Sequence, residues 1–239
     1  MPQTEVQGPA WLVLPTYEEA GNIERIVRRA LESMPEASRV LVVDDNSPDG
    51  TGEIAERLTA ELPVEVLHRA GKEGLASAYI AGFRHALGRG AELVLQMDSD
   101  FSHDPADLRR LIEASERADL VLGSRYVAGG GVRDWSLVRQ AISRGGSAYA
   151  RTILGIEVKD LTGGFKCFHR EVLEAIDLDA ITSQGYAFQV EMTYRALQKG
   201  FRVLEIPIVF RDRQVGNSKM SRAIVLEAAW RVPLLRRRR

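Results

Sequence analysis

The sequence predicts an α/β fold with a mostly parallel central sheet flanked by helices. Between residues 10 and 125, strand-like apolar runs alternate with segments whose apolar residues recur at helical spacing. The runs are apolar at almost every position, which is typical of strands covered on both faces of a parallel sheet. Hydrophobic residues make up 45% of the 239 positions, enough for the core of one large domain.

Each predicted element has a local reason. Pro15 stops the first apolar run, and two later runs end in acidic residues. The expected strands are residues 10–15, 39–45, 64–69, 91–97 and 119–125. The segments between them carry apolar residues every three or four positions, and the expected helices are residues 18–34, 49–62, 74–90 and 104–118. The last helix is expected to begin with Asp104 as its N-cap and Pro105 at its first position.

The second half of the chain is less regular, and no internal repeat or low-complexity linker divides it. Its predicted elements, in order, are a glycine-rich loop (129–135), a basic helix (133–154), a turn with a short strand and a helix start (160–173), a helix (187–200), a strand broken at Pro207 (201–210), a polar loop (211–221) and an amphipathic helix (222–235). We therefore expect a single domain.

Composition narrows the functional class. The 32 basic and 33 acidic residues give a formal charge of -1, which argues against a general nucleic-acid binder. The single Cys167 excludes an internal disulfide framework and a cysteine-rich zinc site, and it suits a reducing cytosol. The N-terminus lacks an apolar signal core, and no apolar run reaches the roughly 18 residues of a membrane span. We expect a soluble or peripheral protein.

Carboxylates follow two predicted strands at the edge where parallel sheets bind ligands. Asp98 and Asp100 end the strand in "LQMDSDFSHD", and such a pair suits Mg²⁺ or Mn²⁺ completed by water and phosphate oxygens. The alternative is a turn that caps the next helix, which Asp104 alone can do. At the end of the predicted strand over 39–45, Asp45 can accept hydrogen bonds from a base or ribose. After the predicted strand over 10–15, Tyr17 can stack on a base. No GxGxxG or P-loop motif is present.

Eight motifs in one order resemble a known family, the polyprenol/dolichol-phosphate mannosyltransferases of glycosyltransferase family 2. They span about residues 11 to 221 and are "LPTYEEAGNI", "VVDDNSPDGT", "GKEGLASAYIAGF", "QMDSDFSHDP", "GSRYV", "DLTGGFKCF", "GYAFQVEM" and "VGNSKM". The resemblance implies the glycosyltransferase A fold. It also implies a nucleotide-binding half at about 10–125 and an acceptor-binding half at about 126–221. The residues of the last segment, 222–239, predict an amphipathic, basic membrane-proximal helix.

The resemblance also implies site residues. Those matching the nucleotide pocket are Pro15, Tyr17, Glu19, Val43 and Asp45. Those matching the metal and diphosphate motif are Asp98, Ser99 and Asp100, with Ser102 where some relatives carry a glutamine ligand. Those matching cations near the phosphates are Arg125, Arg213 and Lys219, the last two in a loop that closes over the site, and Arg139 is a possible further contact.

The implied reaction transfers mannose from GDP-mannose to a polyprenyl monophosphate, with Mg²⁺ or Mn²⁺ and inversion at the anomeric carbon. A phosphate acceptor is already largely ionised near neutral pH, so the site needs cations rather than a strong base. Asp100, Arg125, Arg213 and Lys219 are the expected catalytic residues. The alternatives are a polyprenyl-phosphate hexosyltransferase that uses a UDP-sugar such as UDP-glucose, an enzyme with a hydroxyl acceptor and a catalytic base, and a non-catalytic nucleotide sensor.

Two segments predict peripheral binding to the cytoplasmic face of a membrane. In residues 133–154, apolar side chains lie near one helical face and four arginines accompany them, as an interfacial helix requires. The apolar residues are Trp135, Val138, Ile142, Tyr149 and Ile153. The last segment places Trp230 among aliphatic residues and ends in four arginines. The alternatives are that residues 133–154 pack on the sheet, and that the arginines stand where a longer relative begins a transmembrane region.

Overall fold

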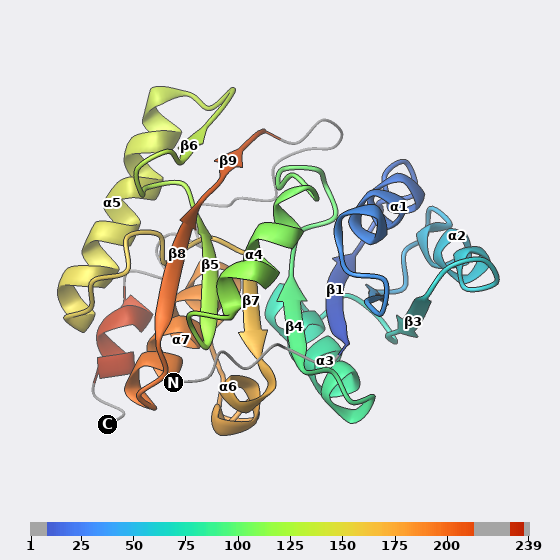
Figure 1. Cartoon of the computed structure of the whole chain (residues 1–239). Helices are drawn as coiled ribbons and strands as arrows, with labels where there is room; N and C mark the ends of the chain where they lie inside the picture. The colour runs from blue at the N-terminus through green and yellow to red at the C-terminus, as the bar shows by residue number, and fades with distance from the viewer. Residues whose placement is uncertain (1–8, 213–229, 237–239) are drawn as a thin grey trace.

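A computed structural model of the chain describes residues 9–212 and 230–236 (Figure 1). It confirms the α/β prediction, because a seven-stranded, mostly parallel sheet carries helices on both faces. The sheet strands are β1 (Ala10–Thr16), β2 (Arg39–Asp44), β3 (Val64–His68), β4 (Leu93–Gln96), β5 (Leu120–Ser124), β7 (Lys166–His169) and β8 (Val203–Pro207). Two further strands, β6 (Gly131–Val132) and β9 (Val209–Phe210), pair in parallel outside it.

The strand order is β3-β2-β1-β4-β7-β5-β8. Strands β1 to β4 pair in parallel, and so do β5 and β8. Strand β7 runs antiparallel between β4 and β5, which places Lys166 beside Gln96. The carboxyl ends of β1, β2 and β4 therefore share one edge, as the sequence predicts.

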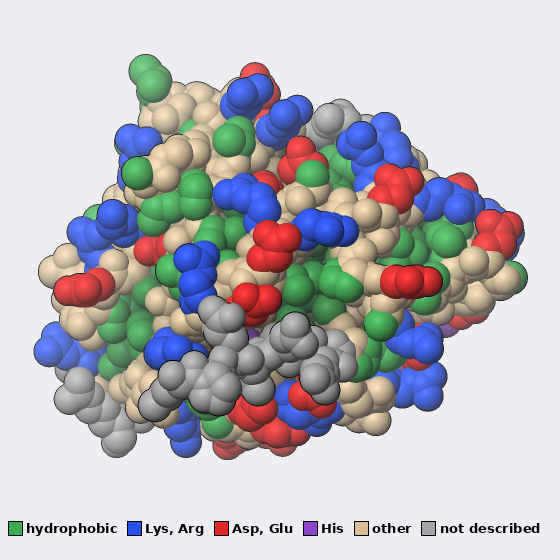
Figure 2. All heavy atoms as spheres, in the orientation of Figure 1, with side chains coloured by type: hydrophobic (Ala, Val, Ile, Leu, Met, Phe, Trp, Pro, Cys, Tyr) green, Lys and Arg blue, Asp and Glu red, His purple; other side chains and the backbone are tan. Residues whose placement is uncertain are grey.

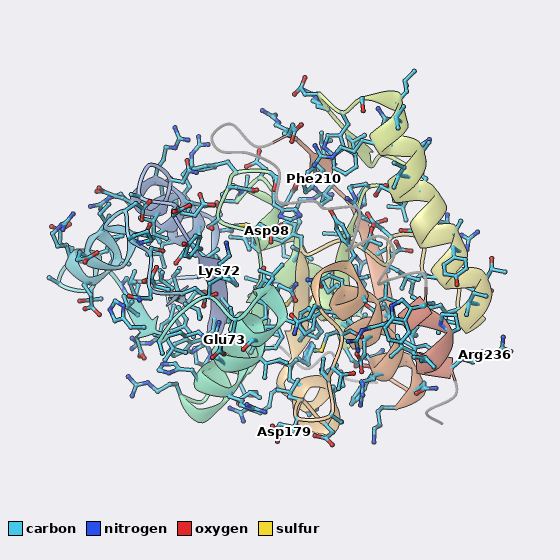
Figure 3. The ribbon with its side chains drawn as sticks, turned by 180° about the vertical axis from the view of Figure 1, so that it is seen from behind. Lys72, Glu73, Asp98, Asp179, Phe210 and Arg236 are labelled. Carbon is cyan, nitrogen blue, oxygen red and sulfur yellow. The ribbon has the colours of Figure 1, made fainter. Side chains whose placement is uncertain are left out.

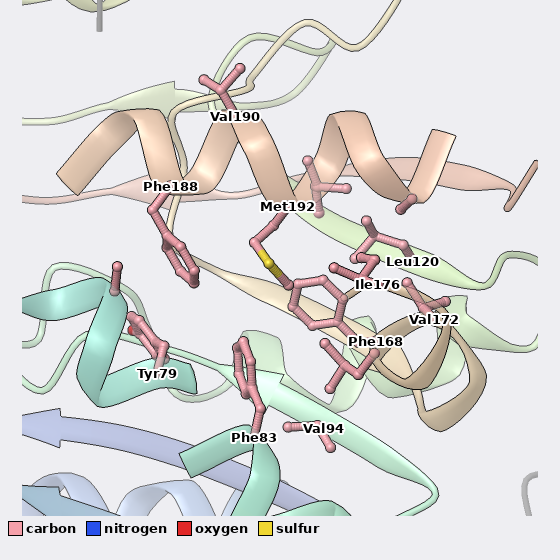
Figure 4. Packing of buried hydrophobic residues seen from close by; sticks show 14 of the residues in the cluster. Tyr79, Phe83, Val94, Leu120, Phe168, Val172, Ile176, Phe188, Val190 and Met192 are labelled. Atoms are coloured by element: carbon pink, nitrogen blue, oxygen red, sulfur yellow. The ribbon is translucent and has the colours of Figure 1, made fainter. Parts of the chain in front are cut away.

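Helices cover both faces of the sheet. They are α1 (Ile23–Ser33), α2 (Thr51–Leu58), α3 (Leu75–Gly88), α4 (Asp107–Ser115), α5 (Leu137–Leu154), α6 (Arg170–Ala175) and α7 (Gly185–Gln198), and residues 230–236 are also helical. One core lies under α1, α2 and α4, and a second lies under α3, α6 and α7. In the second, Phe83 packs on Phe168 at 5.6 Å and Tyr79 on Phe188 at 6.1 Å between ring centroids (Figure 4). Burial of each such side chain contributes roughly 1.5–3 kcal/mol.

Three local predictions need correction. Helix α4 begins at Asp107, because the Asp104 carboxylate accepts the Ala106 N–H at 3.1 Å and closes a turn before the helix. Strand β6 forms in the predicted glycine-rich loop by pairing with β9, a partner far away in the sequence. The basic helix begins only at Leu137, after the Ser136 hydroxyl accepts the Arg139 N–H.

Other boundaries agree with the sequence or lie beyond the described part. The predicted strand over 201–210 divides after Pro207 into β8 and β9. Of the predicted C-terminal helix over 222–235, residues 222–229 lie outside the described residues. Within the described ranges, no helix combines the length and apolar character that a bilayer crossing requires.

Candidate active site

A cavity of about 550 Å³ opens at the carboxyl edge of β1, β2 and β4. Each of the three loops that follow these strands contains one non-glycine residue with left-handed backbone, namely Glu18 (φ 58°), Asn46 (φ 57°) and Phe101 (φ 60°). Such a conformation costs about 1–2 kcal/mol per residue. Strain of this kind concentrates at functional sites, where the surrounding structure maintains it.

The cavity gathers most of the predicted site residues. Those that line it are Pro15, Tyr17, Glu19, Asp45, Asp98, Ser99, Asp100, Ser102, Arg125 and Arg139. Val43 does not line it, because its side chain is fully buried against α3, where a Cβ on Gly82 would lie 3.1 Å from Val43 Cγ2. Its carbonyl instead accepts a hydrogen bond from the Thr16 hydroxyl. Arg213 and Lys219 lie outside the described residues.

Asp45 and Tyr17 each have a cationic partner at one end of the cavity. Arg69 donates to the Asp45 carboxylate, and burial raises the pKa of Asp45, an effect that Arg69 opposes. The Lys72 ammonium lies 3.8 Å from the centroid of the Tyr17 ring. Figure 3 labels Lys72, Asp98 and Phe210, all of which line the cavity. This end offers an acceptor, an aromatic face and a positive charge to a ligand.

Asp98 and Asp100 differ in exposure and partners. The side chain of Asp98 is 34% exposed and accepts a hydrogen bond from the Tyr79 hydroxyl at 3.3 Å. Burial, and then the Asp98 carboxylate, raise the pKa of Tyr79 well above its ordinary value, so Tyr79 remains a donor. Asp100 is buried and accepts hydrogen bonds from the backbone N–H and the hydroxyl of Ser102.

These carboxylates fit a divalent metal ion whose shell is completed by the substrate. In the described part of the chain, no group of three or more His, Cys, Asp or Glu side chains has metal-binding geometry. Two carboxylates beside a cavity match the way proteins hold Mg²⁺, with water and phosphate oxygens as the other ligands. Ser102 lines the cavity, but its hydroxyl already donates to Asp100.

His103 is a buried neighbour of the acids. It is 2% exposed and packs against Phe165 and Phe210 at 4.9 Å and 5.0 Å between ring centroids. Its Nδ1 lies 3.9 Å from Asp98 Oδ2. Burial lowers the pKa of His103 to about 4, so the ring is neutral near pH 7.

Two arginines also line the cavity, each with an acidic partner. Arg125 is buried and binds Asp160 through two nitrogens, at 2.7 Å and 2.6 Å, and also donates to Thr162 at 2.9 Å. The ion pair joins the end of β5 to the loop over 160–164. Arg139 of α5 binds Asp212 at 2.8 Å and lies over the Trp135 ring.

Sequence reasoning missed several residues that shape the site. Lys72, Gly164 and Gln189 line the cavity, and Asp160 holds Arg125. All four fall inside motifs that carried the family resemblance, "GKEGLASAYIAGF", "DLTGGFKCF" and "GYAFQVEM". Only that motif membership pointed to them, since an isolated Lys, Asp, Gly or Gln in a loop or helix has no specific sequence signal.

Comparisons with known proteins identify the family of the chain. The family model described as glycosyl transferase family 2 matches residues 11–177. The chain is 50% identical over 217 residues to the undecaprenyl-phosphate mannosyltransferase of Micrococcus luteus, covering 90% of this chain and 89% of that protein. It is 46% identical over 224 residues to the polyprenol monophosphomannose synthase of Mycolicibacterium smegmatis, covering 92% and 84%.

A solved structure shows the same fold. The glucosyl-3-phosphoglycerate synthase of Mycobacterium tuberculosis, crystallised with Mn²⁺, UDP and phosphoglyceric acid, superimposes with a TM-score of 0.70 at 18% identity, covering 95% of this chain and 79% of that one. The architecture is therefore the glycosyltransferase A fold. By the family model and by both relatives, the chain belongs to glycosyltransferase family 2 and is a glycosyltransferase.

Proposed function

We propose that this enzyme transfers mannose from GDP-mannose to a polyprenyl monophosphate, releasing GDP. The observation that carries the proposal is a cavity lined by both acids and arginines, in a chain 46–50% identical to two enzymes named for mannosyl transfer to polyprenyl phosphates. A phosphate acceptor and a diphosphate leaving group repel each other, so a site that brings them together needs cationic groups near both.

The donor side comprises the loops after β1, β2 and β4, within the nucleotide-binding half at about 10–125. We assign the base and ribose to Pro15, Tyr17, Glu19 and Asp45, and the diphosphate to the turn over 98–100; Val43, which does not line the cavity, is left out of this set. Asp98 and Asp100 would hold Mg²⁺ or Mn²⁺, with Ser102 as a weaker candidate ligand. When bound, the metal neutralises charge on the leaving diphosphate.

The acceptor side comprises Arg125, with its partner Asp160, and Arg139, within the half at about 126–221. We assign the acceptor phosphate to Arg139 and Arg125; both line the cavity, and Asp160 holds the guanidinium of Arg125. We also assign Arg213 and Lys219 to the acceptor phosphate. An acceptor phosphate oxygen forms the bond to the anomeric carbon as the bond to the diphosphate breaks, which inverts α to β. No proton is removed from the ionised acceptor.

The exposed face of α5 supports access to a lipid acceptor from the membrane surface. Its apolar residues Leu137, Val138, Ile142 and Tyr149 are 82%, 69%, 46% and 40% exposed, and arginines flank them. Figure 2 shows hydrophobic and basic side chains side by side where α5 lies. Trp135 and Ile153, also predicted for this face, pack inward.

The helix at 230–236 adjoins α5, because Arg236 donates to the Ile153 carbonyl at 2.9 Å. It carries Trp230, which is 58% exposed. We therefore propose peripheral binding through α5 and the C-terminal segment at 222–239, on the cytoplasmic face where nucleotide sugars are available.

Incubation with labelled GDP-mannose, polyprenyl phosphate and Mg²⁺ or Mn²⁺, followed by lipid extraction, tests the proposal. Labelled lipid is expected with either metal and none after chelation. Labelled UDP-glucose in parallel tests the alternative donor, a polyprenyl-phosphate hexosyltransferase, which is favoured by the UDP in the solved structure of the same fold. Lipid labelled from UDP-glucose and not from GDP-mannose would reject the proposal.

A further inference from the structure

Gln189, in the second turn of α7, lines the cavity although only 3% of its surface is exposed. Its Oε1 has no hydrogen-bond partner among residues 9–212 and 230–236. A buried amide oxygen without a partner costs about 1–3 kcal/mol, and native structures contain few of them. A side chain in this state on the wall of a cavity indicates that a ligand supplies the missing donor.

The backbone of this turn is fixed by contacts with the protein core. Lys166, fully buried in β7, donates to the Gln189 carbonyl at 2.8 Å and to the Thr193 hydroxyl at 3.0 Å. The neighbouring Phe188 packs against Tyr79 in the core (Figure 4). Because α7 is fixed on this face, Gln189 cannot find another partner by a shift of the helix.

Gly164 faces the same space from the loop over 160–164. A Cβ at this position would lie 3.6 Å from both carboxylate oxygens of Asp98 and 3.6 Å from Gln189 Nε2. Asp98, Gly164 and Gln189 therefore converge, and the glycine leaves open the volume that a side chain would fill. Residue 164 does not need positive φ, so only the space distinguishes glycine from alanine here.

We propose that Gln189 and Gly164 form the subsite for the transferred sugar, with Gln189 hydrogen-bonded to its hydroxyl groups. The inference rests on the proposed function, which places the donor diphosphate beside Asp98. The sugar is bonded to that diphosphate, so it occupies the space next to it. An amide offers both donors and an acceptor, which matches hydroxyl groups, and it adds no charge beside the acids.

The first test measures binding rather than transfer. Calorimetry gives the Kd of GDP-mannose and of GDP, with the same metal, for the wild-type enzyme and for Gln189→Met, which keeps the length but loses the hydrogen bonds. GDP-mannose is expected to bind about tenfold more weakly to the variant, and GDP equally well. The control is Gln198→Met, an exposed position on the same helix, which should change neither Kd. Equal loss for both ligands, or loss for neither, would overturn the subsite.

The second variant, Gly164→Ala, tests the same space without removing a hydrogen bond. Its Cβ contacts are at ordinary van der Waals distance, so the melting temperature should match that of Gly88→Ala, where nothing lies within 4 Å. Gly164→Ala should also weaken the binding of GDP-mannose about tenfold and leave the binding of GDP unchanged. Unchanged GDP-mannose binding would contradict the proposal.

The subsite and the proposed function fail in different ways. The Kd values of UDP-glucose and UDP are also measured for the wild-type enzyme and both variants. A wild-type enzyme that makes no lipid-linked mannose, but whose variants discriminate a sugar nucleotide from its nucleotide, would reject the function and keep the subsite. An active wild-type enzyme whose variants show no such discrimination would reject the subsite alone.

Discussion

The proposed donor and acceptor sides of the cavity are assembled in different ways. On the donor side, neighbouring parallel strands deliver short loops to one edge, so the place of each residue follows from the topology. On the acceptor side, the buried pair of Arg125 and Asp160 joins segments 35 residues apart, and Arg139 of α5 binds Asp212, 73 residues later in the chain. Donor-side substitutions should therefore impair chemistry and spare the fold, whereas substitutions in the buried pair on the acceptor side should affect both.

The largest expected effect is on the donor side. Asp100→Ala removes a proposed metal ligand, and we expect kcat/KM for mannosyl transfer to fall by about 10³-fold or more at saturating Mg²⁺, with little change in melting temperature. The matched control is Asp104→Ala, an exposed acid four residues later that closes a turn, which should retain activity. Transfer at a near-wild-type rate by Asp100→Ala would contradict the proposal that Asp100 is a metal ligand.

The corresponding acceptor-side substitution is Asp160→Asn. It leaves the guanidinium of Arg125 buried without its carboxylate partner, and loss of one member of a buried pair typically costs 3–5 kcal/mol, so we expect the free energy of unfolding to fall by about 3 kcal/mol. Urea denaturation measures this. Asp119→Asn breaks a pair with Arg202, which is 68% exposed, and should cost less than about 1 kcal/mol. Similar losses for the two variants would show that burial of the Arg125–Asp160 pair does not determine its contribution to stability.

The same contrast explains how far the sequence predicted the molecule. Apolar runs identified all five strands of the first half, and the acids after them identified the donor side, because both signals are local. The insertion of β7 between β4 and β5 depends on contacts distant in sequence. Gln189 and Asp160 were missed because a buried polar residue leaves the same sequence signal as an exposed one. Val43 was assigned to the pocket by family resemblance, but its side chain packs under α3.

A smaller effect concerns pH and the buried Lys166 on the acceptor side. Burial lowers the pKa of Lys166 to about 7 from its ordinary 10.5, so between these values the unfolded chain binds more protons than the folded one. Folding stability from this residue therefore rises with pH across that window, by up to about 1.4 kcal/mol per pH unit, and is lowest below pH 7. Unfolding free energies at pH 7.5 and 9.5 should rise less steeply in Lys166→Met than in wild type. The exposed Lys199→Met should follow wild type, and equal slopes in all three proteins would show that Lys166 does not titrate in this window.

The smallest expected effect concerns α5, the outermost part of the acceptor side. Leu137 is 82% exposed, so Leu137→Glu should leave the melting temperature unchanged while it removes apolar area and adds a negative charge at the proposed lipid contact. We expect about tenfold weaker co-sedimentation with phosphatidylglycerol vesicles at low salt. Ala60→Glu, an exposed position after α2, adds the same charge away from α5 and should bind the vesicles nearly as wild type does. Equal loss in both variants would indicate a general charge effect, whereas no loss in Leu137→Glu would move the lipid contact away from α5.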